Sequence, residues 1–200
     1  MKRSAFVALG VVATLLVPAV VPAYAAAALA PVAPATPSAA QDLVAANPQG
    51  RTVLVAVINY ENVVGRGVHD RLAAFARANP DIKIVVKPVA GAGPLSEFLA
   101  KAAYAAARQG RFAAFHDGAI AASQANTYYS LRDSAPLLGL DWSQFQRDFQ
   151  DPAIAEQVKA NAKYAADHKI AEAPAFIAGE QVFAGPWEKL DLAKVAAAVK

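Results

Sequence analysis

The sequence predicts an α/β domain in which a strand–helix–strand unit is followed by a long helical insertion, a β-hairpin and a closing helix. Residues 52–58 form a continuous run of aliphatic, largely β-branched side chains, as expected of a strand buried on both faces. A helical pattern and a second apolar run, 82–86, follow within about 35 residues, so the two strands are expected to be parallel neighbours of a βαβ unit. Two further apolar runs, 175–178 and 181–184, flank Gly179-Glu180, which is a two-residue hairpin turn.

A turn precedes the first strand, and a helix follows it. The turn is Asn47-Pro48-Gln49-Gly50, a combination typical of chain reversals. The helix is expected at 68–78, because apolar residues recur there at helical spacing and Asn79-Pro80-Asp81 ends the pattern. Its apolar face comprises Val68, Leu72, Phe75 and Ala76.

The helical insertion is expected at about 95–150, with helices at 95–108, 111–122, 131–137 and 141–149. Five aromatic residues at helical spacings predict core packing there, with an apolar groove for a client as the alternative. They are Phe112, Phe115, Trp142, Phe145 and Phe149. Another helix is expected from Pro152 to about His168, because Asp151 is a good N-cap and proline suits the first helical position. A closing helix is expected at 190–199.

Composition excludes one whole class of chemistry. The chain has 200 residues, 56% of them hydrophobic, and no cysteine. This length and apolar content are typical of a globular domain rather than of a disordered chain. The absence of cysteine excludes disulfides, a catalytic thiolate, an iron–sulfur cluster and zinc sites of the cysteine type.

Neither nucleic acid, a metal nor a cofactor is expected as a partner. Without Lys2 and Arg3, 17 basic residues face 16 acidic ones, and no basic stripe is present. Gly91-Ala92-Gly93 lacks the third glycine of a dinucleotide fingerprint and is expected to be a loop. His116 is expected to be a buried, hydrogen-bonded packing residue. No metal-ligand spacing relates the three histidines, which are His69, His116 and His168.

Residues 1–25 are predicted to be a cleaved secretory signal peptide. Lys2 and Arg3 give it a positive start, an apolar stretch follows, and Ala23-Tyr24-Ala25 has the small-x-small pattern of a cleavage site. The alternative is an uncleaved membrane anchor, the one case in which a membrane is expected as a partner; Pro18 and Pro22 would interrupt such a spanning helix. Residues 26–48, rich in alanine and proline, are predicted to be an extended tether, and 49–200 the folded domain.

Five segments within residues 52–200 together resemble a known family. They read INY at 58–60, VHDRL at 68–72, GRFAAFHD at 110–117, LGLD at 138–141 and APAFI at 173–177. In this order they resemble the DsbA-like thiol:disulfide oxidoreductases of the bacterial envelope. The resemblance implies an α/β, thioredoxin-like fold with a helical insertion and a periplasmic location.

In that family, two cysteines separated by two residues stand at the start of the helix after the first strand, where a thiolate is stabilised. The resemblance places these positions at Asn62 and Gly65, with Val63 and Val64 between them. Neither residue can exchange a disulfide. Thiol:disulfide interchange, which the fold alone would suggest, is therefore excluded, and no catalytic residue is expected at these positions. Asn62 is expected to cap the following helix. Gly65 and Gly67 are each expected to destabilise the first turns of that helix by about 1 kcal/mol relative to alanine.

The family also has a cis-proline before its third strand, and the resemblance places it at Pro174. A cis bond there would leave the backbone groups of Ala173 free to pair with an extended peptide. A trans proline that marks only a turn is the alternative. The residues before it are Glu172-Ala173 instead of the family's usual Gly-Thr, so a hydroxyl is lost and a charge appears. Ala173 and Pro174 are the predicted peptide-binding residues.

Three functions are compatible with these features. The first is a secreted, redox-inactive peptide-binding or chaperone-like module whose partners are unfolded or extended polypeptides. The second is an enzyme with non-thiol acid/base chemistry from Glu61, Arg66 or His69 in the former active-site cleft. The third is an assembly partner that docks through its tether.

Overall fold

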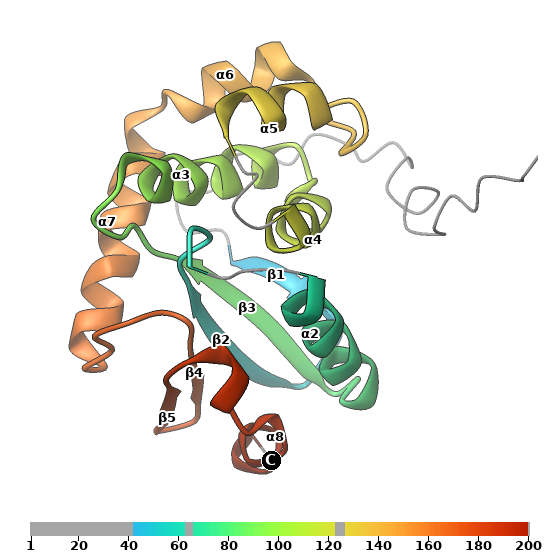
Figure 1. Cartoon of the computed structure of the whole chain (residues 1–200), viewed down its shortest axis with the longest axis vertical. Helices are drawn as coiled ribbons and strands as arrows, with labels where there is room; N and C mark the ends of the chain where they lie inside the picture. The colour runs from blue at the N-terminus through green and yellow to red at the C-terminus, as the bar shows by residue number, and fades with distance from the viewer. Residues whose placement is uncertain (1–41, 63–65, 123–126, 200) are drawn as a thin grey trace, which may run out of the picture.

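The computed structural model describes residues 42–62, 66–122 and 127–199 (Figure 1). These residues form a five-stranded sheet with the strand order β1-β3-β2-β4-β5. Strands β2 and β3 are parallel, and the other neighbouring pairs are antiparallel. The strands are β1 (Leu43–Ala46), β2 (Thr52–Ile58), β3 (Ile82–Pro88), β4 (Ala175–Ala178) and β5 (Gln181–Ala184). The predicted βαβ unit and the hairpin are both confirmed, the latter with Gly179 at a φ of 59° in its turn.

The predicted tether over 26–48 needs correction at its C-terminal end. Strand β1 lies inside that range and pairs with β3, with Leu43 opposite Val86 and Val44 opposite Val85. Leu43 is 1% exposed and belongs to the main core. These four residues, two of them alanine, have too weak a pattern to predict a strand. The strand with which they pair, β3, lies about 40 residues further along the chain. Residues 26–41 of the predicted tether and the whole signal segment lie outside the described residues.

The predicted turn between β1 and β2 is confirmed. The N–H of Gly50 donates to the carbonyl of Asn47 at 2.8 Å. The side-chain amide of Asn47 approaches three carbonyl oxygens at 2.9–3.0 Å, those of Ala76, Asn79 and Ile82. The turn is thus tied to the end of the helix that joins β2 to β3.

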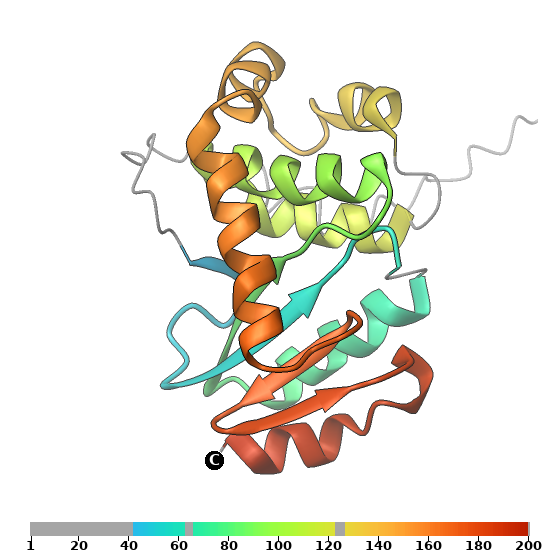
Figure 2. The same cartoon turned by 90° about the vertical axis from the view of Figure 1, so that its left-hand side faces the viewer.

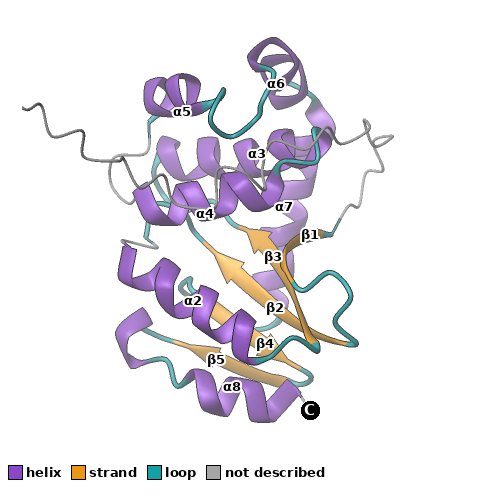
Figure 3. Cartoon of the chain, turned by 90° about the vertical axis from the view of Figure 1, so that its right-hand side faces the viewer, coloured by secondary structure: helices purple, strands orange, loops and turns teal. Residues whose placement is uncertain are grey.

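Helices cover both faces of the sheet (Figures 2 and 3). Helices α2 (Arg66–Ala78) and α8 (Leu192–Val199) lie on one face, and α7 (Pro152–Asp167) crosses the other. Because side chains alternate along a strand, Leu54, Ala56 and Ile58 of β2 join the core on the α2 side. Val57 packs instead with Ala165 of α7 in a second, smaller cluster.

The insertion caps the end of the sheet at which β2 and β3 terminate (Figure 1). Its helices are α3 (Pro94–Arg108), α4 (Phe112–Ala122), α5 (Tyr128–Ser134) and α6 (Trp142–Phe149). Alanines make up much of the buried surface of α3, and such small side chains let the neighbouring helices approach closely. Predicted core packing is confirmed for Phe112, Phe115 and Phe145, which are at most 6% exposed, whereas Trp142 and Phe149 are partly buried.

Capping residues explain where several helices begin. Asp151 accepts a hydrogen bond from the N–H of Ala153 at 2.9 Å with Pro152 following it, as predicted. Helix α5 begins three residues earlier than predicted, because Thr127 and Ser130 form a reciprocal capping box. It ends at Ser134, shortly before Pro136, which has no backbone N–H with which to continue the helical hydrogen bonds.

Helix α7 is fixed to the sheet by one buried polar residue. Asn161 is 1% exposed, and its side-chain amide donates to the carbonyl of Pro88 and to the hydroxyl of Tyr104, both at 2.8 Å. Burial raises the pKa of Tyr104 to about 12. The position of α7 matters for function because this helix forms one wall of the pocket described below. None of the described helices is both long enough and apolar enough to cross a membrane.

Candidate functional site

The two loops singled out in the sequence meet at the end of the sheet. Asn62 lies four residues beyond the end of β2, and Pro174 immediately precedes β4. Strands β2 and β4 are antiparallel neighbours, with Val57 opposite Ala175. The C-terminal end of β2 and the N-terminal end of β4 therefore lie side by side, which brings the Asn62 loop next to the Ala173–Pro174 loop.

A pocket of about 370 Å³ opens between these loops and α7. Its size falls within the range of roughly 300–1,000 Å³ typical of ligand pockets. Aliphatic and alanine side chains form most of its wall, and Glu172 is its one charged lining residue. The lining residues are Val57, Asn59, Asn62, Val89, Ala90, Gly91, Ala162, Ala165, Ile170, Ala171, Glu172 and Ala173.

The Ala173–Pro174 loop presents main-chain groups at the rim of this pocket. The Ala173–Pro174 peptide bond is cis. Pro174 is buried, whereas Ala173 is partly exposed and lines the pocket. Ladder pairing of β4 begins at Ala175, and the backbone N–H and C=O of Ala173 have no hydrogen-bond partner among the described residues. These groups can pair with an extended chain laid along the loop.

A buried asparagine holds the opposite side of the pocket in place. Asn59 is 5% exposed, and its carbonyl oxygen accepts hydrogen bonds from the hydroxyl of Ser96 at 2.7 Å and from the N–H of Glu61 at 3.0 Å. The Ser96 hydroxyl in turn accepts from the N–H of Gly91 at 2.5 Å. Three segments, the end of β2, the loop after β3 and the first turn of α3, are thereby joined. The amide nitrogen of Asn59 has no acceptor among the described residues, and it remains available as a donor at a pocket-lining position.

Beneath the Asn62 loop, Tyr60 and His116 form a buried pair. The Tyr60 hydroxyl and His116 Nδ1 are 2.9 Å apart, and the two residues are 1% and 5% exposed. The pKa of Tyr60 is raised well above its ordinary value, mainly by burial and to a smaller extent by electrostatic interaction with Tyr104 and Asp117. The pKa of His116 is lowered to about 3, mainly by burial and to a smaller extent by electrostatic interaction with the nearby His69. Both groups are therefore neutral at pH 7, and the prediction of a buried, hydrogen-bonded His116 is confirmed.

The residues proposed for acid/base chemistry are directed to different neighbours. His69 lies 3.2 Å from Asp70 and 3.8 Å from Asp117, and it lines a small cavity of about 50 Å³ between α2, α4 and β1. Burial raises the pKa of Asp117. Glu61 instead lies beside Gly93 of the loop after β3. The side chain of Arg66 lies outside the described residues, so two of the three groups can be placed, and these two contact different segments.

Part of the segment that the resemblance aligns with the family's cysteine pair also lies outside the described residues. This applies to Val63, Val64 and Gly65, and with them to the amides that Asn62 was expected to cap. Asn62 itself is exposed, and its N–H donates to the carbonyl of Asn59 at 3.0 Å. Among the described residues, no three histidines, aspartates or glutamates are grouped in a way that could hold a metal ion.

Sequence reasoning missed the contribution of Asn59, Ser96 and Gly91. The signal available was a polar residue directly after a buried strand, followed much later by a glycine-containing loop and a serine in the first turn of a helix. Hydrogen bonds between residues 37 positions apart, such as that of Asn59 with Ser96, leave no periodic trace in the sequence.

A sheet of this topology, with a helical insertion and a cis-proline loop beside the end of its central strand, defines the thioredoxin-like class of proteins. A family model described as a DSBA-like thioredoxin domain matches residues 55–197, and the chain belongs to this family. No curated protein matches the chain.

Solved structures have the same fold. A thioredoxin-like oxidoreductase from Silicibacter pomeroyi DSS-3 matches with a TM-score of 0.69 and 25% identity, over 78% of this chain and 88% of that one. The thiol-disulfide exchange protein alpha-DsbA2 from Wolbachia pipientis matches with a TM-score of 0.66 and 19% identity, over 78% and 84%. A periplasmic thioredoxin-like protein from Salmonella enterica serovar Typhimurium matches with a TM-score of 0.63 and 21% identity, over 88% and 94%. This chain is a DsbA-like protein that contains no cysteine.

Proposed function

We propose that the protein is a redox-inactive DsbA-like module of the bacterial periplasm that binds unfolded or extended polypeptide in the pocket beside Ala173 and Pro174. The observation that carries this proposal is the 370 Å³ pocket between the two loops, whose wall combines aliphatic side chains with polar groups and which has the unpaired backbone of Ala173 at its rim. An extended chain gains main-chain hydrogen bonds at such an edge and places alternate side chains toward the pocket. None of this requires a thiol.

The proposed location rests on two supports. The first is the predicted signal segment at 1–25, and the second is the fold shared with a periplasmic thioredoxin-like protein. Fractionation of cells that express the full chain tests it. The mature protein is expected in the periplasmic fraction, and mass spectrometry is expected to find its N-terminus after Ala25. Retention in the cytoplasm or an intact leader in the membrane would contradict it.

Binding can be tested on the mature protein by NMR. Titration of the isotope-labelled protein with a reduced and alkylated unfolded protein is expected to shift the amide resonances of Asn62, Glu172 and Ala173. The same preparation is expected to suppress aggregation of that client. The proposal fails if those resonances stay unchanged at saturating client and aggregation proceeds at its control rate.

A pair of tryptophan variants on α7 makes the location of binding specific. Ala162 is exposed and lines the pocket, so Ala162→Trp fills the pocket from its rim. Ala160 is also exposed but lies two residues away on a different side of the helix, and Ala160→Trp is the matched control. We expect the first variant to weaken client binding by about tenfold, on the order of 1.4 kcal/mol, and the second to bind as the parent does. Equal binding by both variants would place the client elsewhere.

A further inference from the structure

Among the described residues, the pocket has one charged lining residue, Glu172. Glu172 is exposed, lines the pocket and forms no ion pair among the described residues. Glu61, on the opposite loop, is also exposed, and its carboxylate oxygens lie beside Gly93, two residues from the pocket-lining Gly91. A cation that enters the pocket therefore meets the Glu172 carboxylate, which no described residue neutralises.

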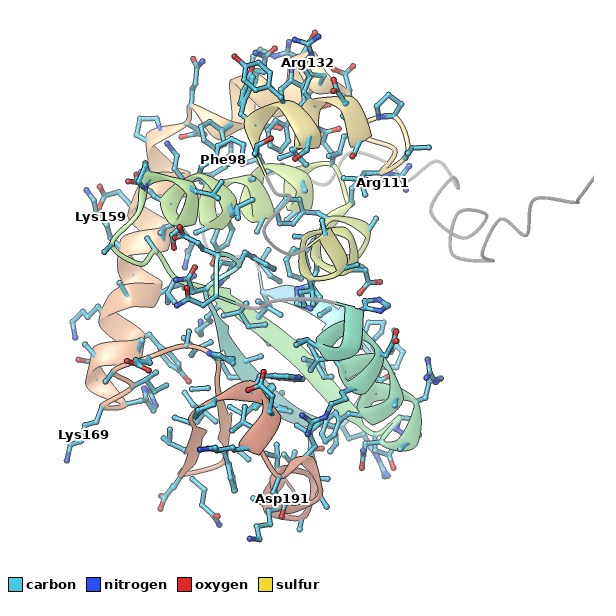
Figure 4. All side chains as sticks on the ribbon, viewed as in Figure 1. Phe98, Arg111, Arg132, Lys159, Lys169 and Asp191 are labelled. Carbon is cyan, nitrogen blue, oxygen red and sulfur yellow. The ribbon has the colours of Figure 1, made fainter. Side chains whose placement is uncertain are left out.

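Two lysines near the pocket in sequence, Lys87 and Lys169, are directed away from it. The ammonium of Lys87, on β3, lies 4.7 Å from the centre of the Tyr164 ring, where the face of the aromatic ring attracts it. Lys169, three residues before Glu172, projects away from the body of the protein at the end of α7 (Figure 4). Neither lysine lines the pocket.

The floor of the pocket suits small aliphatic side chains. Val57 and Ala165 are buried, and Val89 and Ile170 are partly buried around them. The amide nitrogen of Asn59 adds a donor for a carbonyl oxygen at the same wall. A chain segment that enters here thus meets an apolar floor and a negatively charged rim.

Resting on the proposed function, we infer that the protein selects extended segments in which a small aliphatic residue lies two positions from a lysine or arginine. In an extended chain, residues i and i+2 point to the same side. When the aliphatic side chain occupies the floor, a basic side chain two positions away is directed to the same side of the chain, toward the rim that carries Glu172. The specificity comes from this glutamate.

The test uses three labelled peptides that differ only in charge. Each contains Xaa-Ser-Val-Ser-Xaa in a glycine–serine background, with lysine, glutamine or glutamate as Xaa, and binding to the mature protein is measured by fluorescence anisotropy. Because an exposed ion pair contributes little, the lysine peptide is expected to bind about two- to fivefold more tightly than the glutamine peptide at low salt. The glutamate peptide is expected to bind most weakly. The ratio of the affinities of the lysine and glutamine peptides is expected to fall toward one as the salt concentration increases.

Two glutamine variants assign the effect to one side chain. Glu172→Gln is expected to remove most of the preference for lysine. The control is Glu180→Gln in the exposed turn between β4 and β5, a residue that does not line the pocket, and this variant is expected to retain the preference. Equal binding of the lysine and glutamine peptides, or an unchanged preference in Glu172→Gln, would overturn the inference while the proposed function stands. If no peptide binds, the proposed function fails together with the inference.

Discussion

At the scale of single residues, burial decides what the titratable groups can do. His116 occupies a position at which imidazole cannot carry a charge without losing its hydration, and its hydrogen bond to Tyr60 joins two neutral groups. The same pair holds the loop that leads to Asn62 against α4. We therefore assign Tyr60 and His116 to the support of the site and not to chemistry.

His116 is expected to make the fold sensitive to acid. Its pKa is about 3 in the folded protein and about 6.5 in an unfolded chain, so between these values the unfolded chain binds a proton that the folded protein does not. The free energy of unfolding should therefore fall as pH decreases from 6.5 toward 3, by up to about 1.4 kcal/mol per pH unit from this group. The stabilisation is fully present above pH 6.5.

Urea unfolding of the parent protein and of His116→Gln at pH 7 and pH 4 measures this contribution. The variant is expected to be less stable at pH 7 by about 1–3 kcal/mol, because it loses the buried contact with Tyr60. The difference should shrink or reverse at pH 4. His168→Gln, at the end of α7, controls for the replacement of a histidine elsewhere in the fold. A parent–variant difference that does not depend on pH would refute the assignment.

At the scale of secondary-structure elements, packing around the loop after β3 positions the pocket wall. Gly91 lies against Asn59, and a Cβ atom at Gly91 would be 2.6 Å from the amide nitrogen of Asn59 and 3.3 Å from the hydroxyl of Ser96. Asn59 cannot move away freely, because it is buried and accepts two hydrogen bonds. By contrast, nothing lies within 4 Å of a Cβ atom at Gly67 in α2.

Two glycine-to-alanine substitutions should therefore have opposite effects. Gly91→Ala is expected to destabilise the protein by about 1–3 kcal/mol through overpacking and to shift the side-chain amide resonances of Asn59. Gly67→Ala is expected to stabilise it by about 0.5–1 kcal/mol, because glycine loses more conformational freedom in a helix than alanine does. Chemical denaturation followed by circular dichroism measures both changes. The same sign for both variants would contradict the packing described here.

Arg71 joins α2 to the C-terminal segment. Its guanidinium donates to the carbonyls of Trp187 and Leu190, both at 2.9 Å, and lies 5.4 Å from the centre of the Trp187 ring. A lysine cannot reproduce this two-pronged, stacked geometry. The contact therefore helps to hold α8 against the sheet.

Arg71→Lys is expected to lower the free energy of unfolding by about 1–2 kcal/mol and to accelerate hydrogen exchange of the α8 amides in particular. Arg77→Lys, an exposed arginine on the same helix, serves as the control and should leave both quantities unchanged. Uniform acceleration of exchange over the whole sheet would show that Arg71 does not act locally on α8.

At the scale of the whole molecule, the boundary of the folded domain is set by β1. Leu43 packs in the main core, whereas Val44 lies on the other face of the strand and is partly buried. Leu43→Ala is expected to cost about 2–5 kcal/mol of unfolding free energy, and Val44→Ala clearly less, as measured by urea unfolding. A loss of less than 1 kcal/mol in Leu43→Ala would mean that β1 is not part of the cooperative unit.

The candidate site could be predicted in part. The resemblance to the DsbA-like family identified Asn62 and Ala173–Pro174, and the structure brings their loops together because β2 and β4 pair. The pocket itself could not be predicted, because α7 supplies one of its walls. How closely that helix approaches depends on the hydrogen bonds of Asn161, 73 residues from Pro88 and 57 from Tyr104.

The sequence by itself determined the features that neighbouring residues control, which are β2 to β5, the hairpin turn and the cap at Asp151. The cysteine count of zero also excluded thiol-based redox chemistry. Only the tertiary structure decided that Leu43–Ala46 is a strand, that Tyr60 and His116 form a buried hydrogen bond with each other, and that Glu172 lines a pocket. The physical reason is that each of these depends on partners brought from far along the chain. Local propensity and periodicity describe how a segment folds, but the segment against which it packs determines what it can bind.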